Sequence, residues 1–252
     1  MRLQYCSDLH LEFPENRKFI KDHPLQPKGD ILLLAGDIVP FSIMEQQNHF
    51  FDYVSDRFEV VYWLPGNHEF YSGDAAIRSG TLYEKIRKNV FLVNNISFKH
   101  DEVKLVFSTL WSRISPINEW TIQQSLNDFH VITFNGNRFS PSHVNQLHSN
   151  CVRFLQQEIN QKNAEKTVVV SHHVPTFLNY PKMYKGSALN EGFGTEMFDF
   201  IEDSDINYWI YGHHHCNTPA FSIGRTTLLT NQLGYVEHKE HRLFDLANQI
   251  LI

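Results

Sequence analysis

The segment Leu64-Pro65-Gly66-Asn67-His68-Glu69-Phe70 follows an apolar run, residues 60–64, that we predict to be a buried strand. Taken alone, Pro-Gly-Asn indicates an ordinary turn that ends the strand, with Asn67 capping a helix that begins near Glu69. A second interpretation arises because other predicted strands of this chain also end in Asp, His or Asn. On that interpretation, the turn contributes to a site that several strand ends share.

Four other predicted strands lead into polar residues. Residues 3–6 run into Asp8 and His10, residues 31–35 into Gly36-Asp37, residues 167–170 into His172-His173, and residues 208–211 into Gly212-His213-His214-His215. Side chains alternate along an extended chain, so we expect Asp8 and His10 to point to one side, and likewise His213 and His215. By the same reasoning His172, the first residue beyond its strand, reaches a shared centre, whereas His173 and His214 turn away into structural or rim positions.

The segments between these strands predict an α/β protein. Apolar spacing predicts helices over residues 42–58, 75–89 (with Ile77, Leu82 and Ile86 facing inward), 139–162 and 198–201, and Ser140 and Pro141 suit the start of the third. Residues 13–29 are predicted to be a surface connection with about one helical turn. Further strands are expected at 90–98, 103–107, 220–223, 226–230, 243–246 and 249–252, the last four as antiparallel hairpins. Residues 114–141 and 176–194 are expected to be irregular. No linker divides the chain, so we expect one domain over residues 1–252.

Composition argues against several classes of protein. The net charge is −6 and no Lys/Arg block is present, which argues against a dedicated nucleic-acid binder, although bound cations would offset that charge. The three cysteines, Cys6, Cys151 and Cys216, form no zinc-type pair and favour a reducing, cytoplasmic location. No apolar run approaches the roughly 20 residues that cross a bilayer, and no signal-peptide pattern is visible.

The polar strand ends predict a metal centre. In open α/β sheets, sites form beyond the carboxyl ends of the strands, so ends that are distant in sequence can converge. Two carboxylates, four imidazoles and one amide are too many ligands for a single ion, but two ions that share one carboxylate would use the whole set. Oxygen donors mixed with imidazole suit transition metals, with Mn preferred and Fe, Zn, Ni or Co as alternatives. The candidate ligands are Asp8, His10, Asp37, Asn67, His172, His213 and His215.

As a set, these blocks resemble the calcineurin-like metallophosphoesterases. The set comprises Asp8-x-His10, Gly36-Asp37, Gly66-Asn67-His68-Glu69, His172 and Gly212-His213-x-His215, in the family's order. The segments at 108–111 and 127–129 also look like those of small bacterial members. The resemblance implies a four-layer α/β/β/α sandwich in which helices flank two mixed β-sheets and a binuclear site lies at the carboxyl ends of the strands.

The resemblance also implies a role for each block. One metal is expected on Asp8, His10, Asp37 and His215, and the other on Asp37, Asn67, His172 and His213, with Asp37 bridging. A metal-bound hydroxide would attack phosphorus. His68 is the expected catalytic residue, stabilising the transition state or protonating the leaving group, while Glu69 and His214 are expected to support ligands.

The implied activity is hydrolysis of a phosphomonoester or phosphodiester in a small molecule or peptide. A nuclease and a non-enzymatic scaffold with the same fold are the alternatives. Besides Asn67 and His68, we consider Arg113 and Tyr184 as substrate contacts, together with Arg138 and Lys185, and a solvated surface role is the alternative for these last four.

Overall fold

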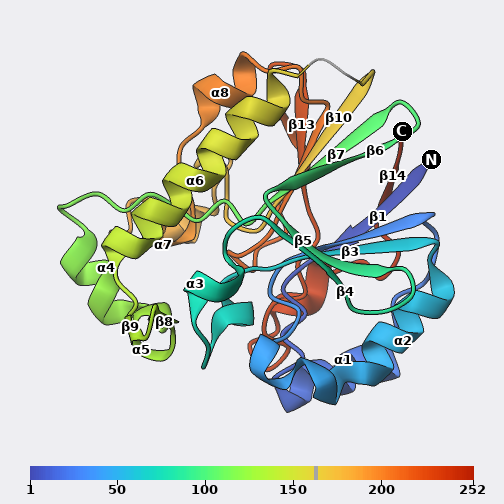
Figure 1. Cartoon of the computed structure of the whole chain (residues 1–252), viewed down its shortest axis with the longest axis horizontal. Coiled ribbons are helices and arrows are strands. Elements are labelled where there is room, and N and C mark those ends of the chain that lie inside the picture. Colours follow the sequence, from blue (N-terminus) through green and yellow to red (C-terminus); the bar gives the residue numbers. More distant parts are fainter. Residues whose placement is uncertain (162–163) are drawn as a thin grey trace.

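The computed structural model describes residues 1–161 and 164–252, and its frame is a pair of six-stranded mixed sheets (Figure 1). In order of pairing, the strands of the first sheet are β14 (Gln249–Leu251), β1 (Arg2–Cys6), β2 (Ile31–Ala35), β3 (Val60–Leu64), β5 (Val90–Asn94) and β4 (Leu82–Lys85). The four central strands are parallel, and β14 and β4 pair antiparallel at the two edges.

The second sheet repeats this plan. Its strands, again in order of pairing, are β12 (Phe221–Ile223), β13 (Thr226–Thr230), β11 (Tyr208–Tyr211), β10 (Lys166–Ser171), β7 (Val103–Ser108) and β6 (Ile96–His100). The central four are parallel, with Val169 of β10 opposite Val106 of β7 and Trp209 of β11. Because the parallel strands of each sheet point the same way, their carboxyl ends all lie on the same side of that sheet, at the end of the strands rather than beside an edge strand.

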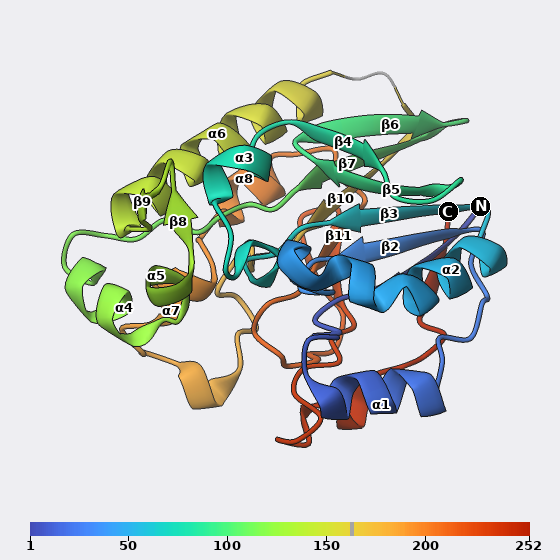
Figure 2. The same ribbon diagram turned by 60° about the horizontal axis from the view of Figure 1, so that its bottom comes forward.

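Helices cover the outer face of each sheet, so the chain has four layers (Figures 1 and 2). The first sheet is covered by α1 (Pro14–Asp22), the 3₁₀ helix η1 (Phe41–Gln47) and α2 (Asn48–Arg57), and the second by α6 (Pro141–Ile159) and α8 (Phe198–Glu202). Successive residues of a strand point to opposite faces of its sheet and so enter different cores. In β7, Leu105 packs between the two sheets, whereas its neighbour Val106 packs toward α6. A third core lies between the first sheet and its helices. The predicted four-layer fold is confirmed.

Short elements surround the carboxyl ends of the strands. They are η2 (His68–Phe70), α3 (Ala75–Arg78), α4 (Glu119–Ser125), α5 (Asp128–Val131), the hairpin β8 (Thr133–Phe134) and β9 (Asn137–Arg138), η3 (Lys182–Tyr184), α7 (Asn190–Phe193) and η4 (Glu240–Leu243). Figure 2 shows α4, α5 and α7 together, at the side to which the arrows of β2 and β3 point. The termini lie at the opposite side, where the Met1 amine donates to the Ile252 carbonyl (3.0 Å).

The predicted helix over residues 75–89 is wrong. Only α3 is helical, and residues 82–85 form β4, which pairs antiparallel with β5 at the sheet edge. Ile77, which was expected to face inward, is 79% exposed. Leu82 is buried, but as a residue of β4 and not of a helix. The helical spacing of the apolar residues is coincidental here, because tertiary pairing with β5 outweighs local propensity.

Other element predictions need smaller corrections. The run 90–98 is not one strand, since Asn95 has a φ of 45° and separates β5 from β6, which belong to different sheets. Residues 240–243 are the 3₁₀ helix η4, so no strand forms at 243–246, and β14 pairs with β1 rather than in a hairpin. The connection at 13–29 contains the nine-residue helix α1, and 114–141 contains α4, α5 and the β8–β9 hairpin.

The predicted helix 139–162 is confirmed as the shorter helix α6, which begins at Pro141 and ends at Ile159; Lys162, the last residue of the prediction, lies outside the described residues. Ser140 occupies the cap position before Pro141, but its hydroxyl makes no capping bond to the backbone. Strand predictions at β2, β3, β10, β11, β12 and β13 are confirmed. No helix in the described part of the chain is both long and apolar enough to cross a bilayer.

Candidate metal centre and active site

The loops after β1, β2 and β11 hold polar side chains on left-handed backbone. The φ angle is 56° at Asp8, 47° at His10, 54° at Asp37, 78° at His213 and 50° at His215. Such angles are strained for residues with a Cβ atom, and they recur at functional sites where surrounding contacts hold them in place. Simple alternation along an extended chain was therefore the wrong geometry for these loops. The backbone instead bends sharply at each of these residues.

The buried carboxylate of Glu69 ties the turn after β3 to the loop after β2. It accepts hydrogen bonds from the backbone N–H groups of Gly66 (2.7 Å), Asp37 (2.9 Å) and Ile38 (2.8 Å), and from the indole Nε1 of Trp63 (3.0 Å). The turn needs glycine at position 66, since a Cβ atom there would stand 2.2 Å from Asp37 Oδ1. These contacts fit the supporting role expected of Glu69.

Glu69→Ala is expected to destabilise the fold, because it leaves these four buried N–H donors without an acceptor. Each unsatisfied donor costs about 1–3 kcal/mol, so we expect the free energy of unfolding to fall by about 3 kcal/mol or more in urea denaturation. Glu69→Gln retains one carbonyl oxygen as acceptor and should lose less. Wild-type stability in the alanine variant would show that this carboxylate does not hold the two loops.

The first group of ligand-type side chains comes from three strand ends. Asp8, His10, Asp37 and His215 each offer one atom, and these atoms lie within 4.8 Å of one another. His10 Nε2 is 2.9 Å from His215 Nε2 and 3.8 Å from Asp37 Oδ2, and His215 Nε2 is 3.4 Å from Asp8 Oδ1. Asp8 and His10 are fully buried. The predicted members of one site are thus brought together.

The second group shares Asp37 with the first. Asp37, His172 and His213 offer ligand atoms within 4.8 Å of one another, with His172 Nε2 3.2 Å from Asp37 Oδ2 and 3.0 Å from His213 Nδ1. The amide oxygen of Asn67 lies 3.2 Å from the same His172 nitrogen. His213 and His215 therefore enter different groups, whereas alternation along an extended chain would place them together; the family resemblance assigned them to different metals.

The chemistry of both groups fits cations. In each, two imidazole nitrogens lie 2.9–3.0 Å apart with carboxylate oxygens beside them, so several atoms that can bind a metal converge on one point. The buried Nε2 of His213 has no hydrogen-bond partner among the described residues. Oxygen and imidazole donors in this mixture suit first-row transition metals, and two such groups joined by one carboxylate form a candidate binuclear centre.

Hydrogen bonds at the far nitrogens hold the imidazole rings. His10 Nδ1 bonds to Glu12 (3.1 Å), His215 Nδ1 to Glu240 (2.8 Å) and His172 Nδ1 to the carbonyl of Ala35 (2.9 Å). Such partners orient metal-binding histidines in proteins. Burial opposes the charged forms, but adjacent carboxylates outweigh it and raise the pKa of His172 to about 9 and that of His215 to about 10.

His173 and His214 have other surroundings. His173 is buried and bonds to the carbonyl of Thr109, and burial together with His172 lowers its pKa to about 3. His214 bonds to the side chain of Gln232, and burial lowers its pKa to about 4. Neither belongs to a ligand group, which agrees with the expectation that both turn away from the centre.

His68 lies next to the first group. Its backbone N–H donates to Asp37 Oδ1 (2.9 Å), and its Nδ1 lies 2.8 Å from Glu12 Oε1, the oxygen that also bonds to His10. The ring stacks on Tyr71 with centroids 4.0 Å apart. His68, His10 and Glu12 form a third set of ligand-type atoms, but Asp37 is not part of it.

A cavity of about 370 Å³ opens onto the two groups. Asp37, Asn67, His68, His213 and His215 line it on the side of the strand ends, and Asp128 of α5 lines it beside Asn67. The rest of the wall includes the aromatic and amide residues Tyr71, Tyr180, Tyr184, Phe193, Tyr235, Asn127 and Asn190, together with Ser125, Leu126, Ser187, Leu189, His214 and Glu240. None of the described residues that line this cavity is lysine or arginine.

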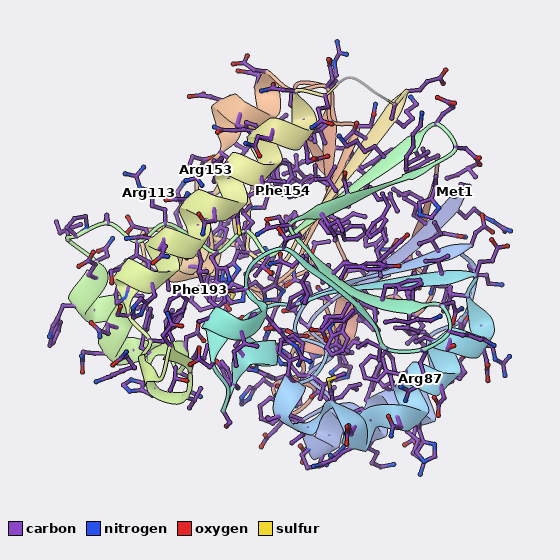
Figure 3. The ribbon with its side chains drawn as sticks, in the orientation of Figure 1. Met1, Arg87, Arg113, Arg153, Phe154 and Phe193 are labelled. Carbon is purple, nitrogen blue, oxygen red and sulfur yellow. The ribbon has the colours of Figure 1, made fainter. Side chains whose placement is uncertain are left out.

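The predicted substrate contacts are placed in different regions. Tyr184 lines the cavity. Arg113 lines a separate cavity beside α6, and Figure 3 shows it apart from Phe193. Arg138 donates to the carbonyl of Phe129, and Lys185 is exposed and does not line the cavity.

Sequence reasoning missed several acidic and aromatic residues at this site, including Tyr71 and Phe193 of the cavity wall. Glu12 could have been found, since it continues the every-second-residue series of Asp8 and His10. Asp128 stood in a segment noted only for its resemblance, and Tyr235 and Glu240 belong to a C-terminal segment whose sequence carries no motif. Only the folded chain places these side chains beside the histidines.

Comparisons with known proteins show the family of this chain. A family model described as calcineurin-like phosphoesterase matches residues 1–217. The uncharacterized protein L509 of Acanthamoeba polyphaga mimivirus is 30% identical over 265 residues, covering 95% of this chain and 93% of the viral protein. The crystal structure of phosphopantetheinyl hydrolase from Mycobacterium tuberculosis is similar with a TM-score of 0.72 and 16% identity, covering 99% of this chain and 95% of that one. This chain thus belongs to the calcineurin-like phosphoesterase family and is a phosphoester hydrolase.

Proposed function

We propose that this enzyme hydrolyses phosphodiesters of small molecules or modified peptides with the help of two transition-metal ions. The observation that carries the proposal is the pair of ligand groups that share Asp37 at one cavity. The structurally similar phosphopantetheinyl hydrolase is named for a phosphoester substrate, and a substrate of that class is compatible with this proposal.

Asp8, His10, Asp37 and His215 would hold one ion, and Asp37, Asn67, His172 and His213 the other. Mn is our first choice, because carboxylate and amide oxygens accompany the imidazoles and no thiol belongs to either group. When bound, such an ion pair supplies a nucleophile from water at neutral pH and neutralises charge on the phosphoryl oxygens. Asp37 would fix the two positions relative to each other.

His68 would donate a proton to the leaving group. The Glu12 carboxylate engages Nδ1 and Tyr71 supports the ring face, so Nε2 is the nitrogen left to meet a substrate. An imidazolium in this position donates a hydrogen bond to the leaving oxygen and then its proton. Glu12 favours the protonated ring, and the pKa of His68 is raised by Asp37 and Glu12 against the opposing effect of burial.

The charge of the cavity favours a diester over a monoester. Asp37, Asp128 and Glu240 line it, and no lysine or arginine does so among the described residues. The two proposed ions would neutralise the single negative charge that a diester carries at neutral pH, whereas a monoester carries nearly two charges, and no lysine or arginine among the described lining residues would balance the second. The same absence of basic side chains weighs against the nuclease alternative.

Hydrolysis of bis-p-nitrophenyl phosphate should exceed that of p-nitrophenyl phosphate in kcat/KM by about tenfold or more, which corresponds to about 1.4 kcal/mol in activation free energy. Both activities should require added Mn²⁺ and vanish with a chelator. Preference for the monoester would contradict the diester assignment. Activity that survives chelation would contradict the metal centre, and absence of turnover with any metal would favour the non-enzymatic scaffold.

A further inference from the structure

Two loops that lie far apart in sequence are joined beside the cavity. The Ser72 N–H donates to the Val131 carbonyl (3.0 Å), and the Thr133 N–H donates to the Gly73 carbonyl (3.0 Å). The Asp74 carboxylate accepts the N–H groups of residues 135 and 136, at 3.0 and 2.7 Å. This contact sets α5 directly against the turn after β3, and thereby brings Asp128 to Asn67.

Asp128 binds two side chains of that turn through one oxygen. Asn67 Nδ2 and the Tyr71 hydroxyl each donate to Asp128 Oδ1 at 2.8 Å. Asn67 and Asp128 are 3% and 6% exposed, so water competes little for either bond. The other end of the Asn67 carboxamide, Oδ1, is the atom that lies 3.2 Å from His172 in the second ligand group.

We infer that Asp128 is a positioning residue that keeps the amide oxygen of Asn67 turned toward the second metal position. An ionised carboxylate only accepts hydrogen bonds, so it binds the NH₂ end of Asn67 and repels the oxygen end. Rotation of the carboxamide by half a turn would set Oδ1 against Asp128 and the NH₂ group toward the metal position. An amide NH₂ has no lone pair for a cation, so the rotated form cannot serve as a ligand. The inference rests on the proposed ligand role of Asn67.

The first test measures metal binding rather than turnover. Metal-free protein is titrated with Mn²⁺, and free Mn²⁺ is followed by electron paramagnetic resonance. Asp128→Ala should weaken one of the two binding events by about 10- to 100-fold, as removal of a ligand's orienting partner does elsewhere, and leave the other near wild type. Asp128→Asn offers a carbonyl oxygen to the Asn67 NH₂ group and should restore most of the affinity. Asp56→Ala, which removes an exposed aspartate of α2, is the matched control and should bind both ions normally.

Loss of both binding events in Asp128→Ala, or failure of Asp128→Asn to restore binding, would overturn the positioning role in favour of a general structural one. Thermal unfolding of each variant shows whether it is folded under the titration conditions. Wild-type binding of both ions by Asp128→Ala would also overturn the inference.

A double-mutant cycle separates this inference from the proposed function. Asn67→Ala should itself weaken one binding event, and adding Asp128→Ala to it should cause no further loss, because Asp128 acts through Asn67. A further loss in the double variant would overturn the inference alone. Normal binding of both ions by Asn67→Ala would show that Asn67 is not a ligand, and the ligand assignment of the proposed function would fail together with the inference.

Discussion

Asp37→Asn is expected to impair binding of both metal ions and to lower turnover by about 10³-fold or more. The loss of turnover follows because the bound ions would supply much of the electrostatic stabilisation of the transition state. Asp37 is the one residue common to the two ligand groups, with Oδ2 3.2 Å from His172 and 3.8 Å from His10. Asparagine keeps the size of the side chain but removes its charge and one of the two anionic oxygens. Neither metal position would then retain its full set of donors.

The measurement is metal content after dialysis against limiting Mn²⁺, together with the steady-state rate on the diester. The matched control is Asp56→Asn on α2, an exposed aspartate whose loss should change neither quantity. Full metal content and normal turnover in Asp37→Asn would refute the bridging role. Loss of a single ion would show that Asp37 belongs to one position only.

His68→Ala is expected to lower kcat by about 10²- to 10⁴-fold while metal content stays near wild type. The ring engages Glu12 and stacks on Tyr71, and it stands outside both groups that contain Asp37. If His68 delivers a proton, its loss should cost more with an alkyl leaving group than with p-nitrophenolate, which departs without help. Comparing a diester of each kind in wild type and variant measures that difference.

A matched control for this variant is His49→Ala, because His49 is exposed on α2 and does not line the cavity. Loss of a metal ion in His68→Ala would reassign His68 as a ligand, in line with its place in the third set with His10 and Glu12. An equal loss of rate for both leaving groups would contradict proton donation and leave only stabilisation of charge.

The layered fold could be predicted because its central strands are buried on both faces. Continuous apolar runs such as residues 31–35 and 60–64 are typical of strands buried on both faces. Helical spacing of apolar residues predicted α2, which covers the first sheet, and α6, which covers the second. The edge strand β4 could not be predicted, because an edge strand is specified by the partner it pairs with. Residues of both sheets share the middle core, which supports the proposal that the chain is a single domain.

The site was predictable where its residues directly follow strands. Asp8, Asp37 and His172 are carried by short local motifs, and parallel strands bring such motifs to one edge. The left-handed backbone at these loops was not visible in the pattern, so alternation alone placed His213 and His215 together, and only the family resemblance assigned them to different metals. Asp128 and Glu240 reach Asn67 and His215 through contacts between distant loops, and their positions depend on packing that no local motif encodes.

The central claim is that two metal ions share Asp37 at the end of β2. The most direct measurement is anomalous diffraction from crystals grown with Mn²⁺. We expect two anomalous peaks about 3.5–4 Å apart, one on each side of the Asp37 carboxylate, at the positions defined by the two ligand groups. A single peak, or peaks that do not touch Asp37, would contradict it.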